Sequence, residues 1–152
     1  VSDLIQAFRT NVDICYMAYF GHGGRSALYL GFREGKDYNL SPWGGVAEDA
    51  SDSTAIEELP TENVRIDAWA NLYSCNSATA EPGGVSMAKA FADHFGITVQ
   101  GAGAGVGFDP KIGPYIRNWR ILEAWRENIM GYQSGGGGWR WIMPDFISPV
   151  VP

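Results

Sequence analysis

Hydrophobic residues along this chain occur as short unbroken runs and as stripes at helical spacing. The runs over 14–20 and 66–73 each end at small or polar residues, a pattern typical of strands buried on both faces of a parallel sheet. A stripe that contains Val85, Ala88 and Phe91 predicts a helix. The predicted elements are helices over 3–10, 85–95 and 115–130, strands over 14–20, 27–32, 66–73, 97–100 and 139–143, and a short helix near 54–59.

The order of the middle elements predicts a crossover connection. A strand, a helix and a second strand, predicted over 66–74, 85–95 and 97–102, form a βαβ unit, which makes its two strands parallel. Ile66 and Leu72 are expected on the same buried face of the first strand. We therefore expect an α/β fold with a mainly parallel central sheet.

Length and composition indicate a single globular domain over residues 1–152. Apolar residues make up 45% of the chain and charged residues 18%, so the chain can bury a core without disulfides or metal. The net charge of −6 argues against a nucleic-acid partner, because no excess of Lys and Arg is available to bind phosphates. No apolar run is long enough to cross a membrane, and the first residues lack the pattern of a signal peptide. Because the chain starts at Val1, we expect an excised or processed piece of a longer protein.

Two of the predicted strands end at residues with reactive side chains. His22 follows the first run among three glycines, and Cys75 follows the second among small polar residues. If these strands are parallel neighbours, both residues lie at the edge of the sheet where open α/β folds place their sites. A thiol beside an imidazole is the minimum equipment for nucleophilic catalysis. The alternative is a hydrogen-bonded loop histidine and an inert buried thiol.

This arrangement resembles the caspase-like cysteine peptidases. In that group an apolar strand ending in His-Gly, here His22-Gly23, precedes an apolar strand ending in Cys, here Cys75. The interval is close to the spacing of about 50 residues that caspases show. The group includes caspases, gingipains, clostripain, the self-cleaving domains of large bacterial toxins, and CHAT domains. The stretch Leu72-Tyr73-Ser74-Cys75-Asn76-Ser77-Ala78 especially resembles CHAT-like domains and peptidase domains of bacterial polymorphic toxins, within a similarity over residues 13–105.

The resemblance implies a three-layer sandwich with a mainly parallel central sheet, of the caspase and gingipain type. Two features depart from the group. Only one predicted helix precedes the strand that ends at His22, whereas the group usually has one or more βα units there, so we expect an N-terminally incomplete domain. The caspase motif Gln-Ala-Cys-X-Gly is absent around Cys75, which excludes a caspase proper.

The resemblance also assigns roles to individual residues. Cys75 is the nucleophile, and His22 is the acid that protonates the departing amine. The backbone N–H groups of Gly23 and Cys75 form the oxyanion hole. The residues expected to contact substrate are Gly24, Ser74, Asn76, Glu81 and Asp109, and the two carboxylates among them would suit a basic side chain.

The other reactive or glycine-rich features have structural explanations. Cys15 lies within an apolar run and is expected in the core. His94 lies on the polar face at the end of a helix, where a cation suits the helix dipole. The glycines over 101–107 lack the order of a phosphate-binding loop and are expected to form one wall of a substrate cleft. The acidic residues over 48–62 do not follow a calcium-binding pattern, so we expect neither a metal nor another cofactor.

The sequence therefore predicts a cysteine endopeptidase that acts on a protein or peptide substrate. By resemblance it is an effector or self-processing domain of a larger bacterial protein, soluble, and secreted or delivered into a target cell. Its expected partners, besides substrate, are the rest of that polypeptide or an inhibitor protein. Two alternatives remain open. One is a catalytically inactive caspase-like interaction module, and the other is a thiol amidase or acyltransferase that acts on a small substrate.

Overall fold

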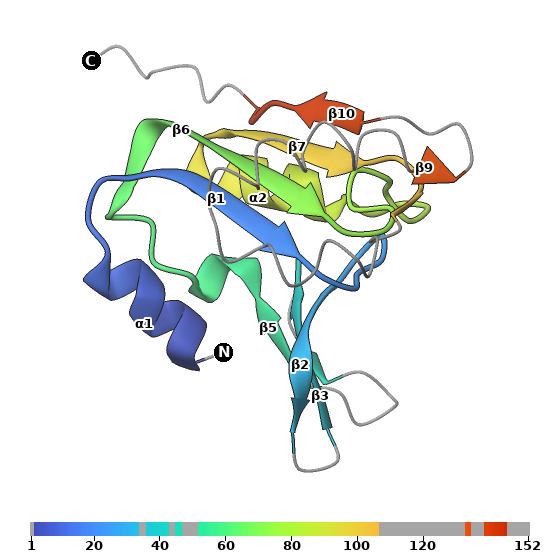
Figure 1. The fold of residues 1–152 in the computed structure, drawn as a ribbon, viewed down its shortest axis with the longest axis horizontal. Helices are drawn as coiled ribbons and strands as arrows, with labels where there is room; N and C mark the ends of the chain where they lie inside the picture. The colour runs from blue at the N-terminus through green and yellow to red at the C-terminus, as the bar shows by residue number, and fades with distance from the viewer. Residues whose placement is uncertain are drawn as a thin grey trace, which may run out of the picture.

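A computed structural model describes residues 2–33, 36–42, 45–46, 52–106, 133–134 and 139–145. The main sheet has four strands in the order β1-β6-β7-β10 (Figure 1). These strands are β1 (Ile14–Phe20), β6 (Val64–Tyr73), β7 (Thr98–Ala102) and β10 (Trp139–Ile142). Both β1 and β7 run parallel to β6, and β10 is antiparallel to β7. The fold is therefore α/β with a mixed sheet, and the parallel crossover predicted from the sequence is confirmed.

Helix α2 (Met87–Phe95) packs on one face of the main sheet, and helix α1 (Ser2–Thr10) lies beyond the edge strand β1 (Figure 1). The Phe8 ring of α1 stacks on the Phe95 ring of α2, with the ring centroids 5.2 Å apart. The helix predicted over 115–130 lies outside the described residues. In the described part of the chain, helix α2 thus covers one face of the sheet, and the three-layer arrangement stays a prediction.

The bounds of α2 follow from its capping residues. The Ser86 hydroxyl accepts a hydrogen bond from the Lys89 N–H at 3.2 Å, which satisfies one of the unpaired donors of the first turn. Gly96 ends the helix in the left-handed conformation, with φ 66°, which glycine adopts without steric cost. The predicted end of this helix at Gly96 is confirmed.

A second, smaller sheet extends away from the main sheet beyond the end of β1 (Figure 1). Its strand order is β2-β3-β5-β4. The predicted strand over 27–32 is present as β2, but the short helix predicted near 54–59 is a strand end followed by a 3-10 turn, η1. The remaining described elements are β2 (Leu28–Arg33), β3 (Lys36–Ser41), β4 (Gly45–Val46), β5 (Asp52–Ala55) and η1 (Ile56–Glu58), and β8 (Gly105–Val106) pairs with β9 (Gln133–Ser134).

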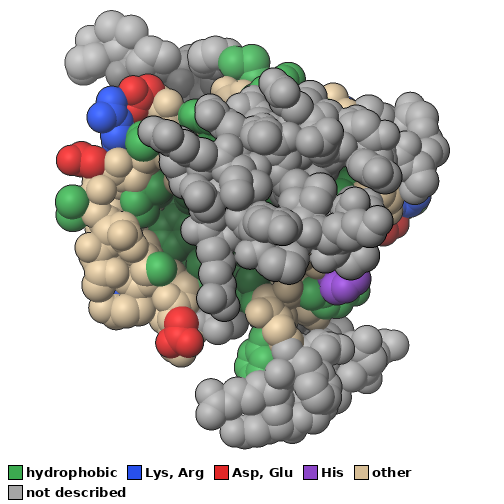
Figure 2. All heavy atoms as spheres, in the orientation of Figure 1, with side chains coloured by type: hydrophobic (Ala, Val, Ile, Leu, Met, Phe, Trp, Pro, Cys, Tyr) green, Lys and Arg blue, Asp and Glu red, His purple; other side chains and the backbone are tan. Residues whose placement is uncertain are grey.

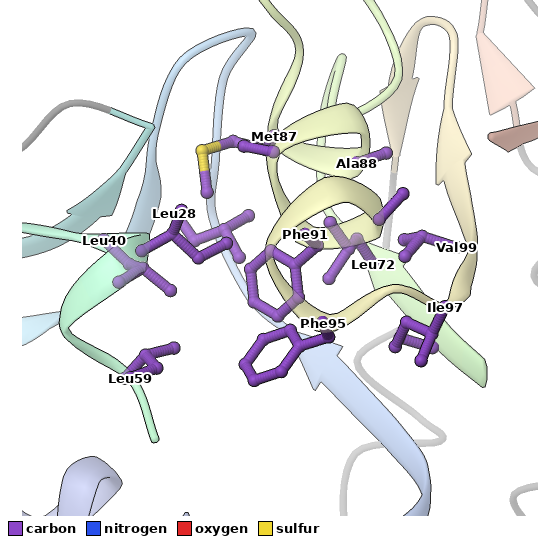
Figure 3. Close-up of a cluster of buried hydrophobic side chains, with 14 of the residues drawn as sticks. Leu28, Leu40, Leu59, Leu72, Met87, Ala88, Phe91, Phe95, Ile97 and Val99 are labelled. Atoms are coloured by element: carbon purple, nitrogen blue, oxygen red, sulfur yellow. The ribbon is translucent and has the colours of Figure 1, made fainter. Parts of the chain in front are cut away.

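One hydrophobic core joins α2 to both sheets (Figure 3). In this view Met87 of α2 lies beside Leu28 and Leu40 of the second sheet. Leu72 and Val99 of the main sheet lie against the same helix, and all five of these side chains are at least 99% buried. Each buried Leu or Val side chain contributes about 1.5–3 kcal/mol relative to its exposed state. The shared core therefore fixes the second sheet next to the edge where β1 ends.

Two expectations about buried residues are wrong. Cys15 is exposed rather than in the core, and Ile66, expected on the buried face of its strand, is 93% exposed. The cause is a shift in the β1–β6 register between Ile14 and Tyr16, where β6 carries additional residues. Such a bulge takes residues out of the ladder, which removes Ile66 from the core face and leaves Cys15 at an irregular position.

Charged side chains are dispersed over the described surface. Figure 2 shows Lys and Arg side chains at opposite margins of this face, with acidic side chains scattered around its periphery. None of the helices in the described part of the chain is long and apolar enough to cross a membrane.

Candidate functional site

The carboxyl ends of β1 and β6 lie side by side, as the sequence predicts. Phe20, the last residue of β1, pairs with Tyr73, the last residue of β6, in a parallel register. The ladder continues one step further, because the Gly21 N–H donates a hydrogen bond to the Tyr73 carbonyl at 3.4 Å. His22 and Cys75 are each the second residue beyond this pair. The register therefore brings both residues to the same edge of the sheet.

The Tyr19 hydroxyl holds the backbone of His22. Its oxygen lies 2.7 Å from the His22 carbonyl and 2.6 Å from the Tyr29 carbonyl, and the Tyr29 N–H donates to the His22 carbonyl at 3.0 Å. Gly21 makes room for this contact, because a Cβ there would lie 2.5 Å from the Tyr19 oxygen. Burial raises the pKa of Tyr19 to about 12, so the hydroxyl keeps its proton at neutral pH. The backbone of His22 is fixed while its imidazole is exposed.

Gly23 brings the two segments into direct contact. A Cβ added at Gly23 would lie 2.9 Å from both Cβ and Oγ of Ser74, and 3.0 Å from the Ala27 carbonyl oxygen. Glycine is the residue that permits this approach. The Ser74 side chain is fully buried, and its hydroxyl has no hydrogen-bond partner among the described residues. The residue after the histidine thus packs on the residue before the cysteine.

Cys75 begins a tight turn that is bonded to the segment following β7. Asn76 adopts a positive φ of 55°, a conformation that Asn tolerates better than most residues. Its N–H donates to the Ala104 carbonyl at 2.9 Å, and its carbonyl accepts from the Thr79 N–H at 2.9 Å. The turn is therefore held by a hydrogen bond to a residue beyond the end of β7.

The buried Ser77 hydroxyl forms several hydrogen bonds that hold this turn. Its oxygen lies 3.1 Å from the carbonyl oxygens of Leu72 and Ser74, and it accepts the Ala102 N–H at 3.0 Å. The Ser77 carbonyl accepts the Ala88 N–H at 2.8 Å, at the first turn of α2. Ser77 thus connects the end of β6 to the end of β7 through its hydroxyl and to the start of α2 through its backbone carbonyl, and so fixes the backbone that carries the thiol.

The Cys75 sulfur lies against the backbone of a single residue, Val106. The Val106 N–H donates to Sγ at 3.2 Å, and Sγ lies 3.6 Å from the Val106 carbonyl oxygen. Within the described residues the thiol makes no hydrogen bond to the His22 imidazole. Among the described residues, His22 and Cys75 therefore lie at one edge of the sheet without a hydrogen bond between their side chains.

The two backbone donors expected to form an oxyanion hole are both available. Neither the Gly23 N–H nor the Cys75 N–H donates a hydrogen bond within the part of the chain that the structure describes. Both follow parallel strands whose ends lie side by side. Free N–H groups at such an edge are suited to bind a developing negative charge.

Comparison of the chain with protein-family models, with curated proteins and with solved structures gives no match. The resemblance to caspase-like peptidases therefore rests on the order, spacing and strand context of His22-Gly23 and Cys75, and stays a prediction.

The residues expected to contact substrate differ in their surroundings. The Gly24 N–H donates to the Ala27 carbonyl at 2.8 Å, which closes the turn after the histidine. Glu81 lies 3.6 Å from the Arg25 guanidinium, and both side chains are about half exposed. A basic substrate side chain would therefore compete with Arg25 for this carboxylate. Asp109 lies outside the described residues.

The remaining candidates have local structural roles. His94 Nε2 lies 2.8 Å from the Leu59 carbonyl oxygen, and its ring contacts Phe95 edge-on, which agrees with a structural histidine. Gly101 packs against Ala78 and Ala88, where a Cβ would come within 3.0 Å of both side chains. Among the described residues, no group of three or more His, Cys, Asp or Glu side chains is placed to hold a metal ion.

Three groups at this edge were not identified from the sequence: the hydroxyls of Tyr19 and Ser77 and the peptide of Val106. A tyrosine in an apolar strand and a serine in a polar turn carry no pattern that reveals their partners. A backbone N–H carries no sequence signal at all. The glycines over 101–107 gave the one available hint, because they predict that the backbone there lies close to the site.

Proposed function

We propose that the chain is a cysteine endopeptidase with a three-layer, caspase-like fold, in which Cys75 is the nucleophile and His22 the general acid and base. The observation that carries the proposal is the parallel β1–β6 register. It brings the histidine and cysteine segments to one sheet edge, with Gly23 packed on Ser74 between them. Within the described residues the N–H groups of Gly23 and Cys75 donate no hydrogen bond, which supports an acyl-transfer reaction in particular, because such groups can bind an oxyanion.

The first half of the reaction forms an acyl-enzyme. The Cys75 thiol loses its proton to the His22 imidazole, and the thiolate attacks the carbonyl carbon of the peptide. As the S–C bond forms, the carbonyl electron pair moves to oxygen, where the Gly23 and Cys75 N–H groups stabilise it. The C–N bond then breaks as the His22 imidazolium donates its proton to the departing amine.

The second half releases the acid product. Water attacks the thioester carbon while the neutral His22 imidazole accepts a proton from that water. Collapse of the second oxyanion breaks the C–S bond, and the proton returns to the Cys75 sulfur. The exposed position of the imidazole suits this role, because the amine must leave and the water must enter on that side.

By resemblance, the biological setting of this activity is an effector or self-processing domain of a larger bacterial protein. The substrate would be a protein or peptide segment, presented to the edge of the sheet. Acidic selectivity residues at Glu81 and Asp109 would favour basic side chains, with Arg25 as the competing partner of Glu81.

The proposal is tested by hydrolysis of a mixed peptide library, with cleavage sites determined by mass spectrometry. We expect cleavage by the wild-type chain and losses on the order of 10³-fold or more in Cys75→Ala and in His22→Ala, because the two groups act as a unit. Cys15→Ala is the matched control: this thiol is exposed on β1, away from the site, and its loss should leave the rate unchanged.

Two results separate the alternatives. Turnover of small amides or acyl donors but of no peptide would indicate a thiol amidase or acyltransferase. Absence of turnover in every substrate class, with an unreactive Cys75, would indicate the non-catalytic interaction module.

A further inference from the structure

Among the described residues, the Cys75 sulfur has two hydrogen-bonding contacts, both with the backbone of Val106. The sulfur lies 3.2 Å from the Val106 N–H nitrogen, which belongs to the Gly105–Val106 peptide, and 3.6 Å from the Val106 carbonyl oxygen, which belongs to the next peptide group. Among the described residues these are the hydrogen bonds of the thiol, and the His22 imidazole makes none to it. The nearest polar contact of the nucleophile is therefore a backbone amide.

The N–H and the C=O of Val106 favour different protonation states of the thiol. The carbonyl can accept a hydrogen bond from the neutral thiol, whereas the N–H can donate to either form and does so more strongly to the thiolate. The N–H contact is the shorter of the two, and S–H is a weak donor. A hydrogen bond to the charged form shifts an ionisation toward that form. The Val106 N–H therefore favours the thiolate form of Cys75.

Hydrogen bonds from the turn after Cys75 hold the backbone just before Val106. The Asn76 N–H donates to the Ala104 carbonyl at 2.9 Å, and the Thr79 hydroxyl donates to the Gly103 carbonyl at 3.1 Å. These bonds connect the turn after Cys75 to the residues immediately before Val106. The N–H is thus directed at the sulfur by the same contacts that shape the turn.

We propose that the Val106 peptide N–H is a catalytic group of this site, which stabilises the Cys75 thiolate independently of His22. The inference rests on the proposed function, in which the thiolate is the nucleophile. It divides the work between two groups. The Val106 N–H stabilises the thiolate by a hydrogen bond once it forms, and His22 accepts the thiol proton and donates it on the exposed side, where the amine departs.

The test replaces Val106 with its α-hydroxy analogue, which changes the amide to an ester and removes the N–H alone. The readout is the rate of iodoacetamide labelling at Cys75 against pH. In this reaction the thiolate displaces iodide from the CH₂ carbon. We expect labelling near neutral pH to fall about tenfold and the midpoint of the pH profile to rise by about one unit, as for loss of one hydrogen bond to a charged group. Labelling of the exposed Cys15 in the same molecules is the internal reference.

Two control variants separate the N–H from other effects. Val106→Ala keeps the N–H and removes the side chain, so its Cys75 profile should match the wild type. The corresponding ester at Ala80, whose N–H donates no hydrogen bond within the described residues, should also match it. Val106→Pro, which also lacks the N–H, provides a second way to obtain the shift, with the circular dichroism spectrum as the check on folding.

The proposal is overturned if the ester at Val106 labels like the wild type, or if Val106→Ala slows labelling as much as the ester. The outcomes also distinguish this inference from the peptidase proposal. A wild-type chain that cleaves peptides, combined with an unshifted ester variant, rejects the inference alone. A chain that cleaves no peptide but shows the shifted profile rejects the peptidase and supports the role of the amide.

Discussion

At the residue scale, the contact between Gly23 and Ser74 determines how closely the histidine and cysteine segments approach. We expect Gly23→Ala to destabilise the fold by about 1–3 kcal/mol, because its Cβ would lie 2.9 Å from the buried Ser74 side chain. Gly24→Ala is the matched control, since a Cβ there meets no atom within 4 Å, and it should change stability by about 0.5 kcal/mol or less. Urea unfolding measures both, and equal effects would contradict the described packing.

Substitutions of Ser74 and Ser77, the serines on either side of Cys75, are expected to have opposite effects on stability. Ser77→Ala removes a hydroxyl that bonds to the Leu72 and Ser74 carbonyls and leaves the buried Ala102 N–H without its acceptor, at a cost of about 1–3 kcal/mol. Ser74→Ala removes a buried hydroxyl that has no partner, so it should be neutral or stabilising. Thermal unfolding of the two variants compares them. A Ser74→Ala variant as unstable as Ser77→Ala would show that this assignment is wrong.

At the scale of elements, α2 is positioned by its first turn, next to the turn that carries Cys75. We expect Ser86→Ala to lower the free energy of unfolding by about 1 kcal/mol, because the Lys89 N–H loses its side-chain acceptor. Ser86→Thr retains a capping hydroxyl and should recover most of this loss. If the alanine and threonine variants unfold at the same denaturant concentration, the cap does not contribute as described.

The elements also show which parts of the fold the sequence could predict. β1, β6 and α2 were predicted because their apolar residues are continuous or helically spaced, and Gly96 marked the end of α2. The second sheet was largely missed, because β4 and β5 are short and the residues of β3 and β5 are mostly polar. Ile66 and Cys15 were assigned wrongly for a related reason: a bulge shifts the register without any change in the local pattern of apolar residues.

The candidate site was predictable only to the level of strand ends. The placement of His22 and Cys75 was expected from two apolar runs that end just before these residues, on the condition that the two strands are parallel neighbours. The hydroxyl of Ser77 and the peptide of Val106 could not be foreseen, because each acts through residues that are distant in sequence and depends on the exact path of the turn.

At the scale of the whole molecule, the Tyr19 hydroxyl connects the main sheet to the second sheet. It lies within hydrogen-bond distance of the carbonyls of His22, after β1, and of Tyr29, on β2. Burial raises the pKa of Tyr19 to about 12, above the ordinary value of about 10. The native state therefore holds this proton over a pH range in which the unfolded chain releases it. The contribution of Tyr19 to the free energy of unfolding is thus fully present below about pH 10 and is lost toward about pH 12.

This coupling predicts a specific change in alkaline stability. In urea unfolding at several pH values, Tyr19→Phe should lose less stability than the wild type between about pH 10 and about pH 12, because the titrating group is absent. Tyr29→Phe removes an exposed hydroxyl, and its free energy of unfolding should fall with pH as steeply as that of the wild type. If the free energy of unfolding of Tyr19→Phe falls as steeply with pH as that of the wild type, groups other than Tyr19 account for the loss of stability at alkaline pH.

The central claim is that Cys75 and His22 function together at the sheet edge, and the most direct measurement is the pH dependence of iodoacetamide labelling at Cys75 in the wild type and in His22→Ala. Peptide mass mapping separates Cys75 from the exposed Cys15, which serves as the reference in each sample. The account predicts fast labelling of Cys75 that persists below about pH 7 in the wild type and falls in His22→Ala. A midpoint near about 8.5, where an ordinary cysteine ionises, with no change in His22→Ala, would contradict it.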